Sequence, residues 1–230
     1  MIKAVNLLKK YKRFQLSIEN LEIEKGESFG LVGNNGAGKS TLFNLIMDLI
    51  KPDKGNVAIK EYEVSKSEEW KFFTSAFLNN GFLIDFLTTK EYFHFIGKLY
   101  NKTAQELDLL ANEYKDFLPE DIFSQKKYIR DLSEGNKVKI GIIASLIGNP
   151  EILILDEPFA HLDPRSQIQL KNILKKLNLD KQTTLLISSH DLNHLTDVSK
   201  RICLLENGKI IKDFQRNENT LKELENYFSV

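Results

Sequence analysis

The sequence has little cysteine, no excess of either charge and no long apolar run. Its one cysteine, Cys203, cannot form an internal disulfide, and its apolar neighbours indicate a buried thiol in a reducing compartment. The 32 basic and 32 acidic residues balance, so no broad positive field would attract nucleic acid. Apolar runs such as Ile152–Leu155 fall far short of the ~18 residues that span a bilayer. The composition therefore disfavours secreted, nucleic-acid-binding and membrane-spanning proteins.

The N-terminal stretch MIKAVNLLKKYKRF is charged and lacks the apolar block and small-residue cleavage site of a signal peptide. We therefore expect a cytoplasmic chain without direct membrane insertion, whose membrane contact goes through a partner. With 42% hydrophobic and 28% charged residues over 230 positions, the chain suits one large folded domain, or a core domain with an insertion.

Alternating apolar and polar residues predict that the chain opens with short β-strands over residues 2–32. A glycine-rich run over 33–38 follows, and helical spacing then extends through Leu49. Residues from about 65 to 149 favour helices, one of which begins at the capping box Thr88-x-x-Glu91. We therefore expect a helical insertion after the glycine-rich run.

The remaining residues alternate between apolar strands and helical segments, which is typical of a parallel sheet covered by helices. Strands are expected near residues 152–155, 183–188 and 201–205. Helices are expected between and after them, near residues 164–178, 190–197 and 217–228. The predicted fold class is therefore α/β.

A glycine-rich motif connects the apolar strand before it to the helix after it. It has the spacing G-x-x-x-x-G-K-[ST], and its residues are Gly33, Asn34, Asn35, Gly36, Ala37, Gly38, Lys39, Ser40 and Thr41. Glycines let backbone N–H groups converge on phosphate oxygens, and the helix N-terminus favours an anion. We expect Lys39 to reach the β- and γ-phosphates of a nucleotide and Ser40 to ligate Mg²⁺. An ordinary glycine turn is the alternative.

Two carboxylates follow the apolar strand at 152–155, and ligands of parallel α/β sheets collect at the carboxyl ends of strands. We expect Asp156 to hold Mg²⁺ through water and Glu157 to polarise the attacking water as a general base. A solvated turn is the structural alternative.

The strand at 183–188 leads to His190, which could contact the γ-phosphate and orient the water. His190 and His194 are four residues apart and could instead share a helix face around zinc. The zinc-protease motif needs Glu directly after the first histidine, whereas Asp191 stands there. We interpret His94 and His161 as packing or turn residues.

Together these motifs resemble the ATP-binding cassette (ABC) family, whose nucleotide-binding domains pair head-to-tail around two ATP molecules. The resemblance spans nearly the whole chain, and its most specific mark is residues 132–136, here called the signature loop. Ser133 would cap a helix running through Ile147, and N–H groups beside it, including that of Gly135, would form a second anion site. In the family this site meets the γ-phosphate held by the other subunit. A plain N-cap is the alternative.

The resemblance implies a single domain over 1–230 with a P-loop NTPase core and an inserted α-helical subdomain. The core, a mostly parallel sheet with an N-terminal antiparallel β subdomain, would span 1–75 and 150–230, and the helical subdomain 76–149. The loop at 160–164 is similar to the one that crosses the dimer interface of the family.

Three further residues take their expected roles from the resemblance. Asp163 is the acid of the interface loop. Tyr11 is similar to the aromatic residue that stacks on adenine, although Phe14 could serve. Asn79 stands where the family offers Gln to Mg²⁺, and because its side chain is one methylene shorter, we expect any contact to pass through water.

The signature loop departs from the family, which usually has Gly-Gly-Gln where this chain has Glu134, Gly135 and Asn136. Glu134 brings a negative charge near a phosphate, so the ATP sandwich would be weaker. Seven of the 15 phenylalanines fall between residues 72 and 95, where the family receives a helix of the membrane permease. An aromatic docking groove is one interpretation of that cluster, and packing in the core is the other.

These expectations lead to an ATP-binding and ATP-hydrolysing subunit. It would pair with a second copy or another cassette and power a separate membrane permease, on the inner face of the cell membrane. A soluble cassette with a mechanical or regulatory role is the alternative, and a small-molecule kinase is a third class. The coiled coil and basic surfaces of the soluble relatives are not visible in the sequence.

Overall fold

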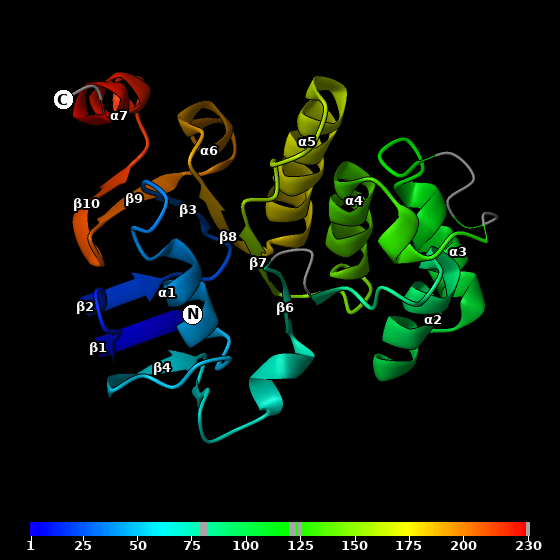
Figure 1. Ribbon diagram of the computed structural model, residues 1–230, viewed down its shortest axis with the longest axis horizontal. Helices are drawn as coiled ribbons and strands as arrows, with labels where there is room; N and C mark the ends of the chain where they lie inside the picture. The colour runs from blue at the N-terminus through cyan, green and yellow to red at the C-terminus, as the bar shows by residue number, and fades with distance from the viewer. Residues whose placement is uncertain (79–81, 120–122, 124–125, 229–230) are drawn as a thin grey trace.

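Two β-sheets organise the chain, which the computed structural model describes over residues 1–78, 82–119, 123 and 126–228 (Figure 1). The smaller sheet is antiparallel and has the strand order β2-β1-β4-β5. Its strands are β1 Ile2–Lys10, β2 Gln15–Ile23, β4 Lys54–Ile59 and β5 Tyr62–Glu63. This sheet confirms the predicted N-terminal antiparallel β subdomain.

The larger sheet has six strands in the order β10-β9-β3-β8-β7-β6. The five strands from β9 to β6 run parallel, and β10 pairs antiparallel with β9 at the edge. Its strands are β3 Ser28–Val32, β6 Thr74–Phe77, β7 Ile152–Asp156, β8 Thr184–Ser189, β9 Arg201–Glu206 and β10 Lys209–Gln215. The mostly parallel α/β core is therefore confirmed.

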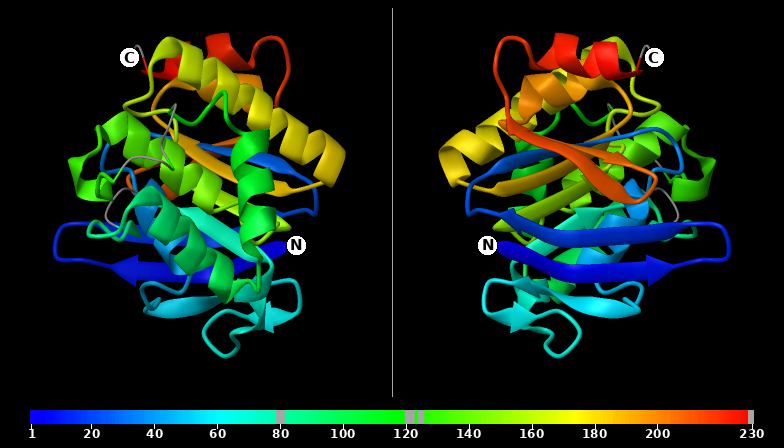
Figure 2. Two further views of the ribbon diagram at one scale, coloured as in Figure 1. Left: turned by 90° about the vertical axis from the view of Figure 1, so that its right-hand side faces the viewer. Right: turned by 90° about the vertical axis from the view of Figure 1, so that its left-hand side faces the viewer.

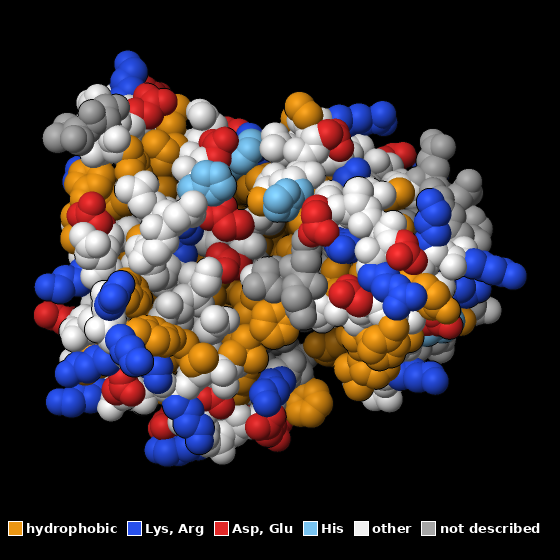
Figure 3. All heavy atoms as spheres, viewed as in Figure 1, with side chains coloured by type: hydrophobic (Ala, Val, Ile, Leu, Met, Phe, Trp, Pro, Cys, Tyr) orange, Lys and Arg blue, Asp and Glu red, His pale blue; other side chains and the backbone are white. Residues whose placement is uncertain are grey.

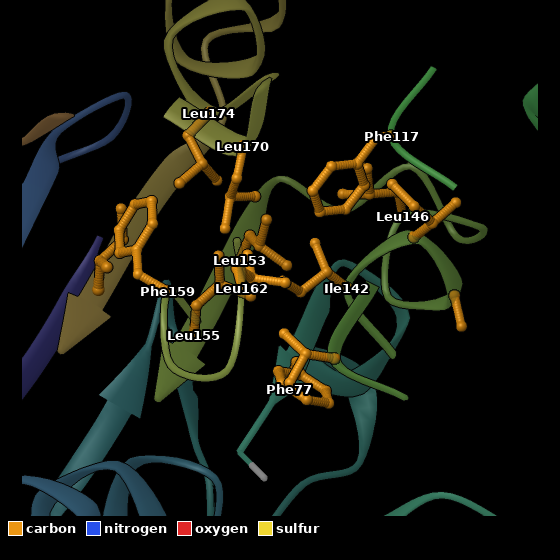
Figure 4. Close-up of a cluster of buried hydrophobic side chains, with 14 of the residues drawn as sticks. Phe77, Phe117, Ile142, Leu146, Leu153, Leu155, Phe159, Leu162, Leu170 and Leu174 are labelled. Carbon is orange, nitrogen blue, oxygen red and sulfur yellow. The ribbon is translucent and has the colours of Figure 1, made fainter. Parts of the chain in front are cut away.

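Strand β7 shows why this sheet is covered on both faces. Ile152 and Ile154 belong to the core beneath the antiparallel sheet, whereas Leu153 and Leu155 belong to the core beneath the helices, and all four are fully buried. Alternate side chains of a strand point to opposite faces, so an unbroken apolar run requires cover on both sides. Figure 4 shows Leu153 and Leu155 among other side chains of the core beneath the helices.

Helices supply that cover (Figure 2). Helix α1 Lys39–Ile46 packs between the two sheets, against β7 and β4. Helices α5 Pro164–Lys181 and α6 Leu192–Val198 pack on the opposite face, and α7 Thr220–Phe228 packs on α6. Helix α1 ends at Ile46 rather than Leu49, because Asp48 takes a left-handed φ of 51° that leaves the helix.

Helical structure dominates the segment between β6 and β7. Its elements are α2 Thr89–Leu99, α3 Ala104–Glu113, the 3₁₀ turn η3 Ile129–Asp131 and α4 Glu134–Ala144. The capping box predicted at Thr88 and Glu91 is present, and Thr103 with Glu106 forms a second one before α3. Helix α4 ends at Ala144, short of the predicted Ile147, and the chain turns through Gly148 and a left-handed Asn149.

The chain enters this helical segment through β6, which follows the 3₁₀ turn η1 Glu69–Phe72. The division predicted after residue 75 falls inside that strand. Gly141 of α4 lies against β6, where an added Cβ would stand 2.3 Å from the ring of Phe77, so glycine permits the close approach. In the described part of the chain, no helix combines the length and hydrophobicity that a membrane span requires.

Candidate active site

The candidate site forms at the carboxyl ends of three neighbouring parallel strands of the larger sheet. Strand β8 lies between β3 and β7, and the register pairs Val32 with Ser189 and Asp156 with Ser188. The residues that follow these strands therefore meet beyond the same carboxyl ends of the strands, although they come from distant parts of the sequence. Figure 3, drawn in the orientation of Figure 1, shows histidine and carboxylate side chains gathered near the middle of the molecular surface.

The glycine-rich loop runs from β3 into α1. Gly33 has no room for a side chain, because an added Cβ would lie 2.3 Å from the carbonyl oxygen of Leu205. Gly38 precedes α1 with a left-handed φ of 110° and offers no capping side chain, and the first turn has no acidic residue. The N–H groups that open α1 are thus available to an anion.

Lys39 is held at the centre of the site. Its side chain is 7% exposed, and Nζ donates a hydrogen bond of 2.7 Å to the carbonyl oxygen of Gly33. The same Nζ lies 3.3 Å from Oε1 of Glu157. The lysine of the loop and the acid directly after β7 are therefore ion partners.

Glu157 connects the lysine to the histidine. His190 lies beside it, with Nδ1 2.8 Å and the backbone N–H 3.3 Å from Glu157 Oε2. Among the described residues, Oε1 accepts no hydrogen bond although it is buried, so the ion pair with Lys39 is what balances it. Glu157 also takes a left-handed φ of 52°, which is uncommon away from glycine and is typical of functional sites.

Ser188 of β8 links the two acids and had no role in the sequence prediction. Its hydroxyl donates to Oδ1 of buried Asp156 and accepts a 2.9 Å hydrogen bond from the backbone N–H of Glu157. One small side chain thus orients one acid and fixes the backbone of the other. A serine at the end of an apolar strand was the available signal, but the strand register was needed to interpret it.

A cavity of about 200 Å³ opens between the loop and Glu157. Its lining residues are Phe14, Asn34, Asn35, Gly36, Gly38, Lys39, Ser40, Thr41 and Glu157. Gly33 and Ala37 belong to the same loop but are buried and do not line the cavity. Seven of the residues predicted to bind nucleotide therefore line one cavity with the predicted base.

The two candidate aromatic residues differ in position. Phe14 lines the cavity, and its ring would lie 2.8 Å from a Cβ on Gly38. Tyr11 lies outside the lining with 48% of its surface exposed, and the two ring centroids are 6.3 Å apart. Phe14 thus lies next to the glycine-rich loop, whereas Tyr11 lies outside the cavity lining.

Ser40 and Asp156 are the predicted metal ligands that the structure describes. Ser40 lines the cavity and is exposed, and Asp156 is 8% exposed at the end of β7. Hydroxyl and carboxylate oxygens are the ligands that Mg²⁺ prefers. Asn79, the third predicted contact, lies outside the described residues.

The other histidine of the zinc alternative is engaged elsewhere. His194 stacks on Phe159 with ring centroids 4.6 Å apart, and its Nε2 lies 3.5 Å from Oδ2 of Asp191. Burial lowers the pKa of His194 below its ordinary value, which favours the neutral ring. His190 faces Glu157, so the two rings have different surroundings.

The signature loop forms the start of helix α4 and is separate from the residues that line this cavity. Ser133 caps α4, accepting a 3.4 Å hydrogen bond from the N–H of Asn136. Among the described residues, neither Ser133 nor Gly135 contributes to the lining of the cavity. An added Cβ on Gly135 would lie 2.6 Å from the carbonyl oxygen of His161, so the loop at 160–164 packs against the helix start.

Asp163 ends that second loop and caps α5. Its carboxylate accepts hydrogen bonds from the N–H and the hydroxyl of Ser166, at 3.0 and 2.6 Å, and lies 3.8 Å from Nζ of Lys139. The Ser166 hydroxyl, followed by its N–H, holds the pKa of Asp163 low, at about 2. Asp163 is therefore ionised at neutral pH and joins the start of α5 to α4.

A separate apolar groove of about 410 Å³, here called the docking groove, lies between the residues that follow α1 and the helical segment. Among its lining residues are Trp70, Phe77, Phe82, Leu99 and Ala144. Four of the seven clustered phenylalanines are exposed, and these are Phe72, Phe82, Phe86 and Phe95, at 68, 57, 69 and 44%. Core packing therefore accounts for Phe77 and Phe93 but not for these four.

The sequence of this chain is similar to those of known proteins. A sequence profile described as "ABC transporter" matches residues 16–160. The ABC transporter A family member 11 of Dictyostelium discoideum is 32% identical over 82% of this chain and 22% of its own length. The methionine import ATP-binding protein MetN 2 of Bacillus cereus is 31% identical over 93% of this chain and 66% of its own length. This chain thus spans less than two thirds of both relatives.

A solved structure gives the same fold. It is the dimeric post-hydrolysis state of an ATP-binding cassette bound to ADP and Pi, and it matches with a TM-score of 0.83 and 27% identity. The match covers 94% of this chain and 100% of that one.

Proposed function

This chain belongs to the ABC transporter family, and from that membership we propose that it binds and hydrolyses ATP, pairs with a second cassette and drives a separate membrane partner. The observation that carries the proposal is the cavity that unites the glycine-rich loop with Glu157, with Lys39 3.3 Å from that carboxylate. A phosphate cradle and a general base are the two parts that nucleotide hydrolysis requires.

The cradle supports binding of a triphosphate. The N–H groups at the start of α1 and the ammonium of Lys39 concentrate positive charge in one cavity, which favours an anion there. Lys39 would exchange its ion pair with Glu157 for phosphate oxygens. Phe14 would contact the nucleotide next to the phosphates, and Tyr11, farther out, would stack on the base.

The residues present also fit Mg²⁺. The exposed hydroxyl of Ser40 and the buried carboxylate of Asp156, which keeps its orientation through Ser188, are oxygen donors of the kind this ion takes. When bound, Mg²⁺ supplies charge neutralisation at the phosphates. We propose Ser40 and Asp156 as its protein contacts, directly or through water.

Glu157 would act on the attacking water. Its Oε1 is buried without a hydrogen-bond donor among the described residues, so it is free to accept a proton or a water hydrogen bond once Lys39 turns to phosphate. His190, 2.8 Å from Oε2, fixes the orientation of the carboxylate and would contact the γ-phosphate.

Pairing follows from the position of the signature loop. The N-terminus of α4 is an anion site in form, yet among the described residues it does not line the cavity of its own chain. In a head-to-tail pair, Ser133 and Gly135 would meet the γ-phosphate held by the other cassette. The dimeric relative with ADP and Pi supports the pairing of two cassettes.

The docking groove supports a membrane partner. Its floor is apolar, and Phe82 at its rim exposes 57% of its surface, so a helix with bulky apolar side chains would be buried there. We propose that a cytoplasmic helix of a separate permease occupies it. The chain would then be cytoplasmic and peripheral on the inner face of the membrane.

The decisive experiment is sedimentation of a Glu157→Gln variant with and without ATP. We expect ATP to convert monomers to dimers, because the nucleotide binds but the water is not activated, and turnover should fall about a hundredfold or more. Glu19→Gln, an exposed carboxylate of β2, is the control and should behave as the parent chain. Monomers of Glu157→Gln at saturating ATP would overturn the proposal.

A further inference from the structure

The first turn of α4 carries an acid–base pair beside the Ser133 cap. Glu134 is the first residue of the helix, and its Oε1 accepts a 2.9 Å hydrogen bond from Nζ of Lys137. The side chain of Lys137 is only 15% exposed, whereas that of Glu134 is 52% exposed. The side chain of Lys137 is therefore largely withdrawn from water, and its ammonium contacts the Glu134 carboxylate.

A second pair stands next to it. Lys139, also 15% exposed, lies 3.8 Å from Asp163, which caps α5. These two pairs thus contribute two cations and two anions at the start of α4, with no net charge between them. This balance needs a reason, because a helix N-terminus that receives a phosphate gains from an excess of positive charge.

The plain structural interpretation is that both features stabilise the helix. An acid in the first turn interacts favourably with the helix dipole, and a pair three residues apart supports an exposed helix. That interpretation predicts that removing either partner loosens α4 and weakens every function of the signature loop alike.

We propose that Glu134 and Lys137 together set how tightly the closed dimer holds ATP, with Lys137 cancelling the charge that Glu134 would otherwise present to the triphosphate. This rests on the proposed pairing of cassettes. The pair keeps the closed state weaker than an uncompensated Lys137 would make it, so that the dimer reopens when the γ-phosphate is lost.

The two single substitutions should then act in opposite directions. Glu134→Gln removes the carboxylate that Lys137 contacts and should tighten ATP-dependent dimerisation, whereas Lys137→Met removes the ammonium that Glu134 contacts and should weaken it. A single charge at this distance from a triphosphate is expected to change the dimerisation constant on the order of fivefold. The double variant should return close to the parent value.

The experiment measures dimerisation constants by sedimentation equilibrium in the Glu157→Gln background, with ATP, at low and high salt. Opposite shifts that shrink as salt rises are the expected result, because screening weakens charge effects but not packing effects. The control is the pair Glu63 and Lys66, which has the same spacing and a 2.8 Å contact in another part of the fold. Glu63→Gln and Lys66→Met should leave the constants unchanged.

Each other outcome is decisive. If Glu157→Gln dimerises with ATP but Glu134→Gln leaves its constant unchanged or weaker, the pair does not set closure and this inference fails alone. If both single variants weaken the dimer equally at all salt concentrations, the structural interpretation holds instead. If the Glu157→Gln parent forms no dimer, the proposed function and this inference fail together. Thermal unfolding of each variant separates these results from a loss of folded protein.

Discussion

Lys39 and Glu157 are partners across the cavity, with Nζ 3.3 Å from Oε1, so the cation assigned to the phosphates balances the carboxylate assigned to the water. The pair reaches from the start of α1 to the end of β7. In the proposed function each residue would have two partners in turn, because phosphate oxygens that attract Lys39 would release Glu157 for the water.

The first prediction removes the lysine. Lys39→Ala should weaken ATP binding about 10- to 100-fold, because it deletes a charge-assisted contact and leaves Glu157 uncompensated near the phosphates. Titration calorimetry would measure the dissociation constant. Lys60→Ala, which breaks a 2.8 Å ion pair with Glu151 elsewhere, is the matched control. Equal ATP affinity of the Lys39 variant and the parent would refute the assigned role.

The second prediction concerns the serine that links the acids. Ser188→Ala removes the donor to Asp156 Oδ1 and the acceptor of the Glu157 N–H. We expect stability to fall by about 1–3 kcal/mol and turnover by roughly tenfold, with a higher Mg²⁺ requirement, because buried groups lose their partners. Thermal unfolding and ATPase assays over a Mg²⁺ series would measure these effects.

Ser189→Ala is the control for that experiment. Ser189 is its buried neighbour on β8, and its hydroxyl accepts a 3.0 Å hydrogen bond from the N–H of Asp191 instead. It should lose comparable stability without a change in the Mg²⁺ requirement. An unchanged Mg²⁺ requirement in Ser188→Ala would show that Ser188 does not orient the metal-binding acid.

Ser188 also marks the limit of what the sequence could predict. The glycine-rich loop and the two acids at the end of β7 are local patterns, so their places at strand ends could be predicted from neighbouring residues. Asp156 and Ser188 meet only because β7 and β8 pair in one particular register, and that register joins residues 32 positions apart. The roles of Glu157, His190 and the signature loop stay predictions, since position alone does not test them.

The fold shows the same division between local and distant information. The parallel core and its helices were predicted from apolar runs and spacing, and the structure confirms them. Strand β6 was predicted as part of a helical segment, because its four residues have no alternating pattern and become a strand by pairing with β7. The exposure of Phe72 and Phe86 likewise depends on the packing of distant helices, which composition does not contain.

The third prediction follows the pKa of Asp163. Its folded value, about 2, lies below the ordinary value of 3.8, so the carboxylate stabilises the folded state above pH 3.8 and that contribution is lost as pH falls toward 2. The melting temperatures of the parent and of Asp163→Asn should therefore differ near neutral pH and converge toward pH 2. Circular dichroism melts across this range would measure the difference. A constant difference at every pH would contradict the assigned hydrogen bonds.

The fourth prediction tests the docking groove. Phe82 and Phe86 are 57 and 69% exposed, so replacing both with alanine should leave the stability of the isolated chain almost unchanged. If these rings anchor a permease helix, the fraction of tagged chain that sediments with membranes from its source cells should fall roughly tenfold, since aromatic anchors dominate interface energies.

Ile168→Ala provides the contrast, because Ile168 is equally apolar and 60% exposed but lies on α5, away from the groove. It should remain membrane-associated to the same extent as the parent. Unchanged membrane association of the Phe82 and Phe86 double variant would mean that these rings do not hold the partner. A loss in both variants would point to a general effect of surface hydrophobicity and not to the groove.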